Sequence, residues 1–206
     1  MSHILLEEVK RLKAIAETGL LYAGNEYDKE RYHELHQMSL RLLGAIGDHS
    51  VEALQQHFAL AKDYPTAKVD IRGLVLSPDK KILLAKESAD GRWSLPGGWA
   101  DVGFTPKEII IKEMKEETGL DVTVQRLLAV FDKRMHPHPP QPFYVYKMVF
   151  LCEAVSEEIN KGFDVLDVQY FSINDLPELS EDRILKSQIE MLYQKVSAGD
   201  LTTTFD

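Results

Sequence analysis

Residues 95–120 read LPGGWADVGFTPKEIIIKEMKEETGL, and this stretch predicts a helix whose two ends are both specified. At its start, Thr105 and Glu108 have the spacing of a capping box. Pro106 falls at the first helical position, where a missing N–H is harmless. At its end, Gly119 suits the left-handed position that closes many helices. We therefore expect a capped helix between Thr105 and Gly119.

Three glutamates of this helix, Glu113, Glu116 and Glu117, stand at i, i+3 and i+4 and so point into one arc. At about 100° per residue, Glu117 lies only ~20° from Ile110, the centre of the apolar stripe. Like charges at these spacings repel by roughly 0.2–0.5 kcal/mol per pair, and burial adds to the penalty. A bound divalent cation with oxygen ligands removes this penalty, and Mg²⁺ typically uses one or two carboxylates plus substrate phosphates.

The alternative for these glutamates is a solvated acidic face that keeps the protein soluble. Gly97 and Gly98, which follow Pro96, favour the metal site instead. Two glycines let the backbone come close to a ligand and turn its carbonyls or amides inward. The combination of this turn with the acidic helix predicts a divalent-metal site.

Composition restricts the class of protein. The chain of 206 residues carries a formal net charge of −9 and 44% hydrophobic residues, as expected of a globular protein without membrane spans. An acidic surface repels long polyanions, so nucleic acid is not the expected partner, whereas a small phosphorylated ligand can bind through a metal. The single cysteine, Cys152, lies in an apolar run, which predicts a buried inert thiol and a cytoplasmic location.

Residues 1–62 are expected to form a small helical domain. Apolar residues repeat at helical spacing twice, at Leu5, Val9, Leu12 and Ile15, and at Leu35, Met38, Leu42 and Ile46. Gly19 and the stretch Ala23-Gly24-Asn25 are expected to break the two helical runs, Asp28 to cap the second helix, and Ser50 to begin a third. Helices this few bury little surface alone, so we expect them to pack on the rest of the chain or on a second copy, and we predict a homodimer through residues 1–60. A DNA-reading helix-turn-helix is disfavoured by nine acidic against six basic residues in 1–60.

Residues 67–206 are expected to form an α+β domain with a mixed sheet. The boundary falls at 63–66, where Pro65 disfavours helix in the residue before it. The expected strands are 69–76, 82–85, 122–131, 143–154 and 165–171, and the expected helices are about 105–118 and about 181–196.

The stretch from Gly98 to Leu120 resembles the Nudix box, a Gly, five residues, Glu, seven residues, then Arg-Glu-apolar-x-Glu-Glu-x-Gly-apolar. The match at its end is KEMKEETGL, residues 112–120, and GRWSLPGG, residues 91–98, is similar to the usual approach. The resemblance implies an αβα sandwich and metal-dependent attack of water on a nucleoside diphosphate linked to another group. It also implies that Glu113, Glu117 and the Gly97 carbonyl bind Mg²⁺, with Mn²⁺ an alternative. Glu116 completes the cluster, and the general base is Glu116 or Glu117.

Two residues depart from the box. Lys112 replaces Arg, which keeps the charge but loses the bidentate fork; we expect it to lie between Glu108 and Glu116. Phe104 replaces the early Glu, and we expect it to pack on Ile109 as a hydrophobic staple. The ligand glutamates are intact, so a catalytic site is still expected.

A closer resemblance covers most of the chain. GGWADV, residues 97–102, and the helical N-terminus are similar to a bacterial Nudix subgroup whose members are often labelled ADP-ribose pyrophosphatases, while some resemble CDP-choline pyrophosphatases. The expected reaction therefore hydrolyses the diphosphate of such a compound to a nucleoside monophosphate and a phosphorylated leaving group.

Several other residues are weaker candidates for contact with the substrate. The candidates are Arg72 and Arg92 for phosphate, His136 and His138 in the proline-rich loop 134–142, and Trp93, Trp99 and Tyr144 for stacking on a base. The structural alternatives are surface salt bridges for the arginines, a surface or dimer-contact loop for the histidines, and core packing for the aromatics.

Two other functions remain open at this point. One is an RNA-end processing enzyme that uses the same metal site, which the net charge disfavours. The other is a nucleotide-sensing regulator whose box binds without turnover.

Overall fold

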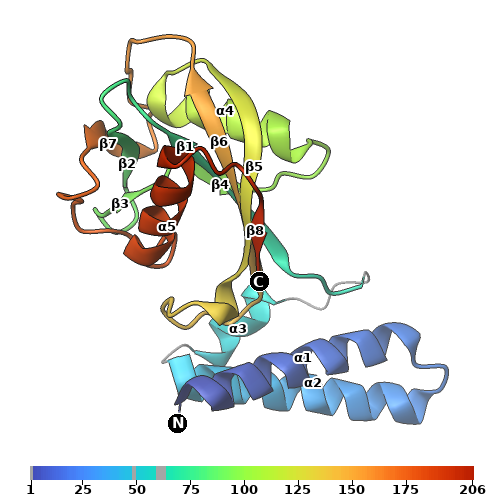
Figure 1. Ribbon diagram of the computed structural model, residues 1–206. Helices are drawn as coiled ribbons and strands as arrows, with labels where there is room; N and C mark the ends of the chain where they lie inside the picture. The colour runs from blue at the N-terminus through green and yellow to red at the C-terminus, as the bar shows by residue number, and fades with distance from the viewer. Residues whose placement is uncertain (1, 48–49, 59–63) are drawn as a thin grey trace. The chain divides into compact units, whose positions relative to one another are not determined.

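The computed structural model describes residues 2–47, 50–58 and 64–206 (Figure 1). The chain divides into two compact units. The helical unit comprises Met1–Ala67 together with Pro140–Tyr144, and the catalytic unit comprises Lys68–Pro139 and Val145–Asp206. Residues 140–144, which the sequence placed in the catalytic domain, therefore cluster with the helices.

The helical unit consists of α1 (Ser2–Tyr22), α2 (Glu26–Gly47) and α3 (Val51–His57). Its core holds one set of buried apolar residues from all three helices: Leu6, Val9, Leu40, Leu43 and Leu54. Gly19 does not break α1. A Cβ there would lie 2.4 Å from the Tyr32 ring, so glycine is what lets the two long helices approach.

Two further expectations for these helices need correction. The second helix begins before Asp28, and the side chain of Asn25 accepts a hydrogen bond from the Asp28 amide at 2.9 Å, so Asn25 supplies the cap. The expected stripes are also only partly buried, because Leu5, Ile15, Met38 and Leu42 are exposed. The cap of α3 is confirmed, with Ser50 accepting from the Ala53 amide. These helices therefore leave an apolar face uncovered within the unit.

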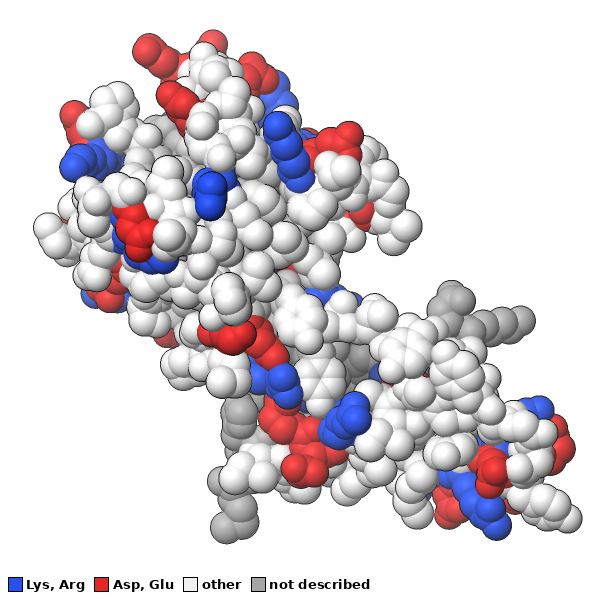
Figure 2. Space-filling model, turned by 45° about the vertical axis from the view of Figure 1, so that its right-hand side comes forward, with Lys and Arg blue, Asp and Glu red and all other residues white. Residues whose placement is uncertain are grey.

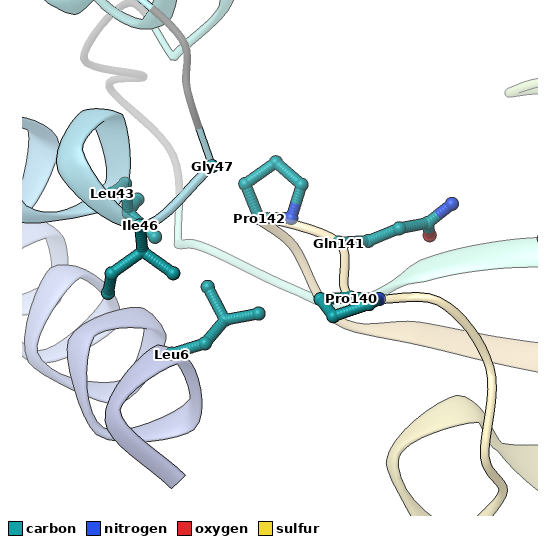
Figure 3. Close-up of a pocket in the computed structure, with 7 residues that line it drawn as sticks. All are labelled: Leu6, Leu43, Ile46, Gly47, Pro140, Gln141 and Pro142. Carbon is teal, nitrogen blue, oxygen red and sulfur yellow. The ribbon is translucent and has the colours of Figure 1, made fainter. Parts of the chain in front are cut away.

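The segment Pro140–Tyr144 packs against α1 and α2 (Figure 3). A pocket lies there, with helical side chains on one side and the proline segment on the other; its lining residues are Leu6, Leu43, Ile46, Gly47, Pro140, Gln141 and Pro142. Nearby, the Lys10 ammonium lies 4.3 Å from the centroid of the Tyr144 ring. Tyr144 therefore belongs to the helical unit.

The catalytic unit holds two sheets. The larger has the order β4 (Gly97–Trp99), β1 (Lys68–Val75), β6 (Val145–Ala154), β5 (Val122–Asp132) and β8 (Thr204–Phe205). It is mixed, because β1 runs parallel to β6 while β4 and β1, and β5 and β6, are antiparallel. The smaller sheet has the order β3 (Trp93–Ser94), β2 (Ile82–Glu87) and β7 (Val165–Phe171). The expected α+β class with a mixed sheet is confirmed.

Two helices cover the sheets from different sides (Figure 1). Ile109, Ile110 and Met114 of α4 (Pro106–Thr118) pack in one cluster with Ile71 of β1. Ile189 and Leu192 of α5 (Lys186–Ser197) pack in another with Leu74. Since Ile71 and Leu74 point to opposite faces of β1, the residues at even positions, Asp70, Arg72 and Leu74, share the α5 face. The polar residues Asp70 and Arg72 of β1 therefore lie on this face.

The five strands expected in residues 67–206 are present to within a few residues. The helix expected at about 105–118 is also present, as α4. The short strands β3, β4 and β8 and the 3₁₀ turn η1 (Lys133–Met135) were not expected, and α5 begins at Lys186 rather than near 181. Cys152 is buried, and burial raises the pKa of its thiol to about 12, as expected of an inert thiol. None of the described helices is long and apolar enough to cross a membrane.

Candidate active site

The helix α4 is capped as its sequence predicts. The Thr105 hydroxyl accepts from the Glu108 amide at 3.2 Å, and Glu108 accepts from the Thr105 amide at 2.8 Å, which completes the capping box. Pro106 lies in the first turn, and Gly119 has φ 76°, the left-handed conformation that glycine tolerates. Local sequence therefore fixes both the start and the end of the helix that carries the glutamates.

Glu117 points inward and contacts the glycine turn. Its side chain is buried, and its Oε2 accepts a hydrogen bond from the Gly97 amide at 2.9 Å. Burial raises the pKa of its carboxyl to about 8, although Arg72 and the Gly97 amide act in the opposite direction. A negative charge at this position needs a cation, because an isolated buried carboxylate is strongly unfavourable.

Glu113 lies beside the second glycine of the turn. A Cβ on Gly98 would stand 2.6 Å from Glu113 Oε1, so the absence of a side chain makes room for this carboxylate. Gly97 has φ 140°, and a Cβ there would lie 2.0 Å from the Ile71 carbonyl oxygen. Burial raises the pKa of the Glu113 carboxyl as well, with Arg72 opposing. The two glycines thus bring the backbone of β4 against both carboxylates.

Glu116 and Lys112 lie farther out. The Glu116 side chain is exposed, and the Lys112 ammonium lies 3.9 Å from it. Lys112 also pairs with Asp101 at 3.0 Å, which corrects the expected pairing with Glu108, because the capping box already engages that residue. Phe104 is exposed, with the Lys112 ammonium 5.8 Å from its ring centroid, which argues against the expected staple.

A loop distant in sequence holds the last turn of α4. The amide of Asn160 donates to the Thr118 carbonyl and the amide of Gly162 to the Glu117 carbonyl, each at 2.9 Å. A Cβ on Gly162 would lie 2.0 Å from the Glu116 carbonyl oxygen. These amides satisfy carbonyls that a helix end otherwise leaves unpaired. Apart from the glycine itself, no pattern in the sequence predicts this support.

Arg72 is buried behind the glutamates in an ion-pair network. Its guanidinium lies 3.0 Å from Asp70 and 3.4 Å from Glu87, and it donates to the Leu95 carbonyl at 3.1 Å. Burial opposes its ionisation, but Asp70 and Glu87 hold the pKa of the guanidinium above its usual range. Its positive charge also favours ionisation of Glu113 and Glu117. Arg72 is therefore placed to act through these carboxylates.

The other residues predicted to contact substrate lie at different places in the structure. Arg92 is half-exposed and pairs with Glu178 at 2.9 Å. Trp99 follows Gly98 directly and is 48% exposed, with the Lys68 ammonium 5.4 Å from its ring centroid. Trp93 packs edge-on against Phe171 at 4.7 Å between ring centroids, which supports a core role.

His138 is buried, and its surroundings were not expected from the sequence. Its Nδ1 lies 2.6 Å from the Glu181 carbonyl oxygen, and burial lowers the pKa of its imidazole to about 4. Lys133 and Lys147 lie near it and oppose its protonation. Lys147 pairs with Asp70, its register partner across β1 and β6. His136 is separate, pairing with Asp206 at 3.0 Å.

The donor atoms of the glycine turn and α4 fit a hard divalent cation. Two carboxylates, Glu113 and Glu117, converge on the backbone of Gly97 and Gly98, and oxygen is the ligand type that Mg²⁺ prefers. Within the described ranges no group of three His, Cys, Asp or Glu side chains is arranged to hold a metal ion. Glu116 lies instead 3.9 Å from the Lys112 ammonium, so a cation here would have two carboxylates and backbone atoms as ligands.

Comparison with known proteins identifies the family. Residues 67–192 match the NUDIX domain model, and residues 4–58 match the model described as a UDP-X-like, N-terminal oligomerisation domain. The chain therefore belongs to the Nudix hydrolase family and is a pyrophosphatase-type enzyme of it. Hydrolases of this family generally use divalent metal ions.

Two relatives resemble nearly the whole chain. The putative ADP-ribose pyrophosphatase YjhB of Bacillus subtilis is 38% identical over 201 residues, covering 98% of this chain and 96% of the relative. The crystal structure of a UDP-X diphosphatase is 34% identical, with a TM-score of 0.64, and covers 100% of this chain and 99% of its own. An ADP-ribose pyrophosphatase structure from Streptococcus suis, also 34% identical with a TM-score of 0.59, covers 68% of this chain and all of its own. The resemblance to the Nudix family read from the sequence is thereby confirmed.

Proposed function

We propose that this enzyme hydrolyses the diphosphate bond of a nucleoside diphosphate derivative of the ADP-ribose or CDP-choline type. The products are a nucleoside monophosphate and a phosphorylated leaving group. The observation that carries the proposal is the contact between the Gly97 amide and Glu117, with Glu113 against Gly98, because it gathers a buried and a half-buried carboxylate at one turn. The names of the ADP-ribose pyrophosphatase and UDP-X diphosphatase relatives support the same substrate class.

The proposed cofactor is Mg²⁺, with Mn²⁺ as the alternative. Glu113, Glu117 and the Gly97 carbonyl would hold it, and Glu116 would complete the acidic cluster. When bound, the metal polarises phosphoryl oxygens and lowers the pKa of an attached water. The charge of Arg72 favours ionisation of Glu113 and Glu117. The exposed Glu116 and the buried Glu117 are the candidates for accepting the proton of the attacking water.

Four residues are proposed to contact substrate. Trp99 presents an exposed ring next to Gly98, where a base can stack. His138 is a buried acceptor, and Arg92 offers a half-exposed guanidinium. Arg72 is proposed to act mainly by positioning the glutamates, because its own donors are engaged with Asp70 and Leu95.

The decisive test is turnover by the purified protein with Mg²⁺ or Mn²⁺. The panel contains ADP-ribose, CDP-choline, CDP-glucose and UDP-glucose, and the readout is nucleoside monophosphate. Glu113→Gln and Glu117→Gln are expected to abolish the activity, while Glu116→Gln separates the two candidate bases. No monophosphate from any compound with either metal would refute the proposal, and shortening of a labelled RNA would instead favour the RNA-processing alternative.

We also propose a homodimer through the helical unit. Exposed apolar side chains follow α1 and α2, namely Ile4, Leu5, Ile15, Leu21, Met38 and Leu42. Exposed apolar surface of this kind marks interaction sites. The oligomerisation description of the matching N-terminal model supports the same conclusion. A monomeric mass by light scattering would refute it.

We further propose that nucleic acid is not a partner of this protein. On the face that Figure 2 shows, acidic and basic side chains are interspersed, with broad uncharged areas between them. With a net charge of −9, such a surface lacks the electrostatic term that dominates binding to long nucleic acids. A reducing, cytoplasmic location is proposed on the buried single thiol of Cys152.

A further inference from the structure

The ion-pair network around Arg72 continues to the protein surface through Glu87. The Arg72 guanidinium lies 3.4 Å from Oε1 of Glu87, and Nε of Arg183 lies 3.0 Å from the same oxygen. Glu87 is buried, whereas the Arg183 side chain is 27% exposed. A buried carboxylate needs a paired cation, and Arg72 is already shared with Asp70. Arg183 therefore supplies a second cation for Glu87.

The Arg72 guanidinium holds the main chain that leads into the glycine turn. Its Nη1 donates to the Leu95 carbonyl at 3.1 Å, two residues before Gly97. In the sheet, Arg72 is also the register partner of Gly97. Because Nη1 faces both Glu87 and the Leu95 carbonyl, the position of the Glu87 carboxylate affects the hydrogen bond to Leu95.

Glu87 lies at the end of β2, in the turn that leads to β3. Its amide donates to the Arg92 carbonyl at 2.8 Å, and the Gly91 amide donates to the Glu87 carbonyl at 2.9 Å. The main chain of Glu87 is thus fixed by the turn, while its side chain is held by two guanidinium groups. Since β3 continues directly into Leu95, this turn and the glycine turn belong to one short stretch of chain.

Arg183 is itself held by the segment 178–183, which runs beside β3. The Ser180 amide donates to the Trp93 carbonyl at 2.8 Å, and the Ser180 hydroxyl donates to Asp90 at 2.7 Å. Nη1 of Arg183 donates to the Ser180 hydroxyl at 3.0 Å. The planar guanidinium is therefore oriented at Nη1 while its Nε faces Glu87, and an arginine oriented in this way loses little further freedom on pairing.

We infer that Arg183 and Glu87 are positioning residues, which hold the Arg72 guanidinium against the main chain that leads into the glycine turn. The Gly97 amide, which contacts Glu117, then keeps its place in that turn. This structural role does not depend on the substrate. Its consequence for metal binding rests on the proposed function, since the turn would supply a ligand of the proposed cation.

Amide hydrogen exchange of the metal-free protein tests the inference without any substrate. Arg183→Gln is expected to speed exchange of the Gly97 amide about tenfold, the effect of losing about one hydrogen bond. Amides of β5, which report opening of the whole sheet, are expected to keep their wild-type rates. Glu178→Gln is the matched control, because it breaks the exposed pair with Arg92 between the same two segments and should change neither rate.

Metal binding measures the consequence at the proposed site. Calorimetric titration with Mn²⁺ is expected to give about tenfold weaker binding for Arg183→Gln and for Glu87→Gln, the usual cost of losing a residue that orients a metal ligand. The double variant is expected to bind no more weakly than the weaker single variant, because two residues that act through one contact are not additive. Losses that multiply in the double variant would overturn the shared route through Arg72.

Two exchange results would overturn the inference even if the enzyme hydrolyses its substrate. One is an unchanged rate at Gly97 in Arg183→Gln, and the other is equal acceleration at Gly97 and in β5. A wild-type protein that binds no Mn²⁺ and hydrolyses nothing would instead refute the proposed function, and the exchange rates would still decide the inference. Glu87→Gln replaces Arg183→Gln in the exchange measurement if that variant fails to fold, as judged by its melting curve.

Discussion

The backbone amide of Gly97 donates a hydrogen bond to Oε2 of Glu117 across 2.9 Å, joining β4 to α4 at the point where the proposed chemistry takes place. One partner is a glycine in a conformation that other residues rarely adopt, and the other is a buried carboxylate. The contact connects the two halves of the sequence stretch 95–120, which are 20 residues apart at these positions. The predictions below test what this arrangement and its surroundings contribute.

Replacing Glu117 with Gln should separate catalysis from folding. The amide oxygen of Gln can still accept from Gly97, and burial of a neutral group is less costly than burial of a charge, so the melting temperature without metal should not fall. Activity should fall at least about 100-fold, because loss of even an outer-shell partner of a metal costs about 10–100-fold. Steady-state kinetics with a melting curve checks both. A variant that melts earlier but retains activity would contradict the assignment of Glu117.

The two glycines of the turn should respond differently to alanine. In Gly97→Ala the new Cβ meets the backbone oxygen of Ile71 at a strained φ, so unfolding free energy should fall by about 1–3 kcal/mol or more. In Gly98→Ala the Cβ meets only the flexible end of Glu113, so stability should change by less than about 1 kcal/mol while activity falls at least about tenfold. Urea denaturation and kinetics on both variants make the comparison. Equal loss of stability in both would contradict the assigned contacts.

The buried imidazole of His138 should make stability depend on pH. Burial lowers its pKa in the folded protein to about 4 from an ordinary value of 6.5. Between these values the unfolded chain binds a proton that the folded chain does not, so stability rises with pH in this window. The contribution is up to about 1.4 kcal/mol per pH unit and is lost as the pH falls from 6.5 toward 4.

His138→Asn removes this titration and provides the comparison for that prediction. The wild-type minus variant difference in unfolding free energy, measured by urea denaturation at several pH values, should shrink as the pH is lowered through the window. Acidic groups contribute equally to both proteins and cancel in the difference. A difference that stays constant from pH 7 to pH 4 would show that His138 does not titrate in this way.

The exposed apolar side chains of the helical unit should control assembly. Ile15→Asp together with Leu42→Asp, at positions 44% and 43% exposed, should leave the folded unit intact but place charges in the proposed dimer interface. Light scattering should give twice 23.4 kDa for the wild type and about 23.4 kDa for the variant. Val155→Asp, an exposed apolar position on the catalytic unit, serves as the control and should not change the mass. An unchanged mass in the double variant would remove these residues from the interface.

The parts of the structure that the sequence predicted well are those set by local interactions. The boundaries of α4 follow from Thr105, Pro106 and Gly119, all within one turn of the helix ends. The long strands follow from runs of apolar residues. Short strands such as β4 were missed because Gly97 and Gly98 have no strand preference, and their pairing comes from β1, more than 20 residues away.

The burial of Lys147 and His138 could not be predicted, because it depends on which distant segments become neighbours. Lys147 alternates with apolar residues in β6 and, in sequence, resembles an ordinary exposed strand lysine. Only the register of β1 and β6, which pairs Asp70 with Lys147, buries it. His138 was a candidate for substrate contact, but its burial and its held Nδ1 depend on Glu181, 43 residues away. Long-range pairing of this kind leaves no periodic signal in a single sequence.

The loop 160–162 has a consequence for the tolerance of this enzyme to mutation. The Gly162 amide holds the carbonyl of Glu117, and a methyl group at Gly162 would collide with the carbonyl of Glu116. A saturation-mutagenesis map of activity should therefore show an intolerant position at Gly162, more than 40 residues beyond the end of α4. Variants there would be misread as surface changes by any inspection limited to residues 95–120, although they move the last turn on which two of the three glutamates stand.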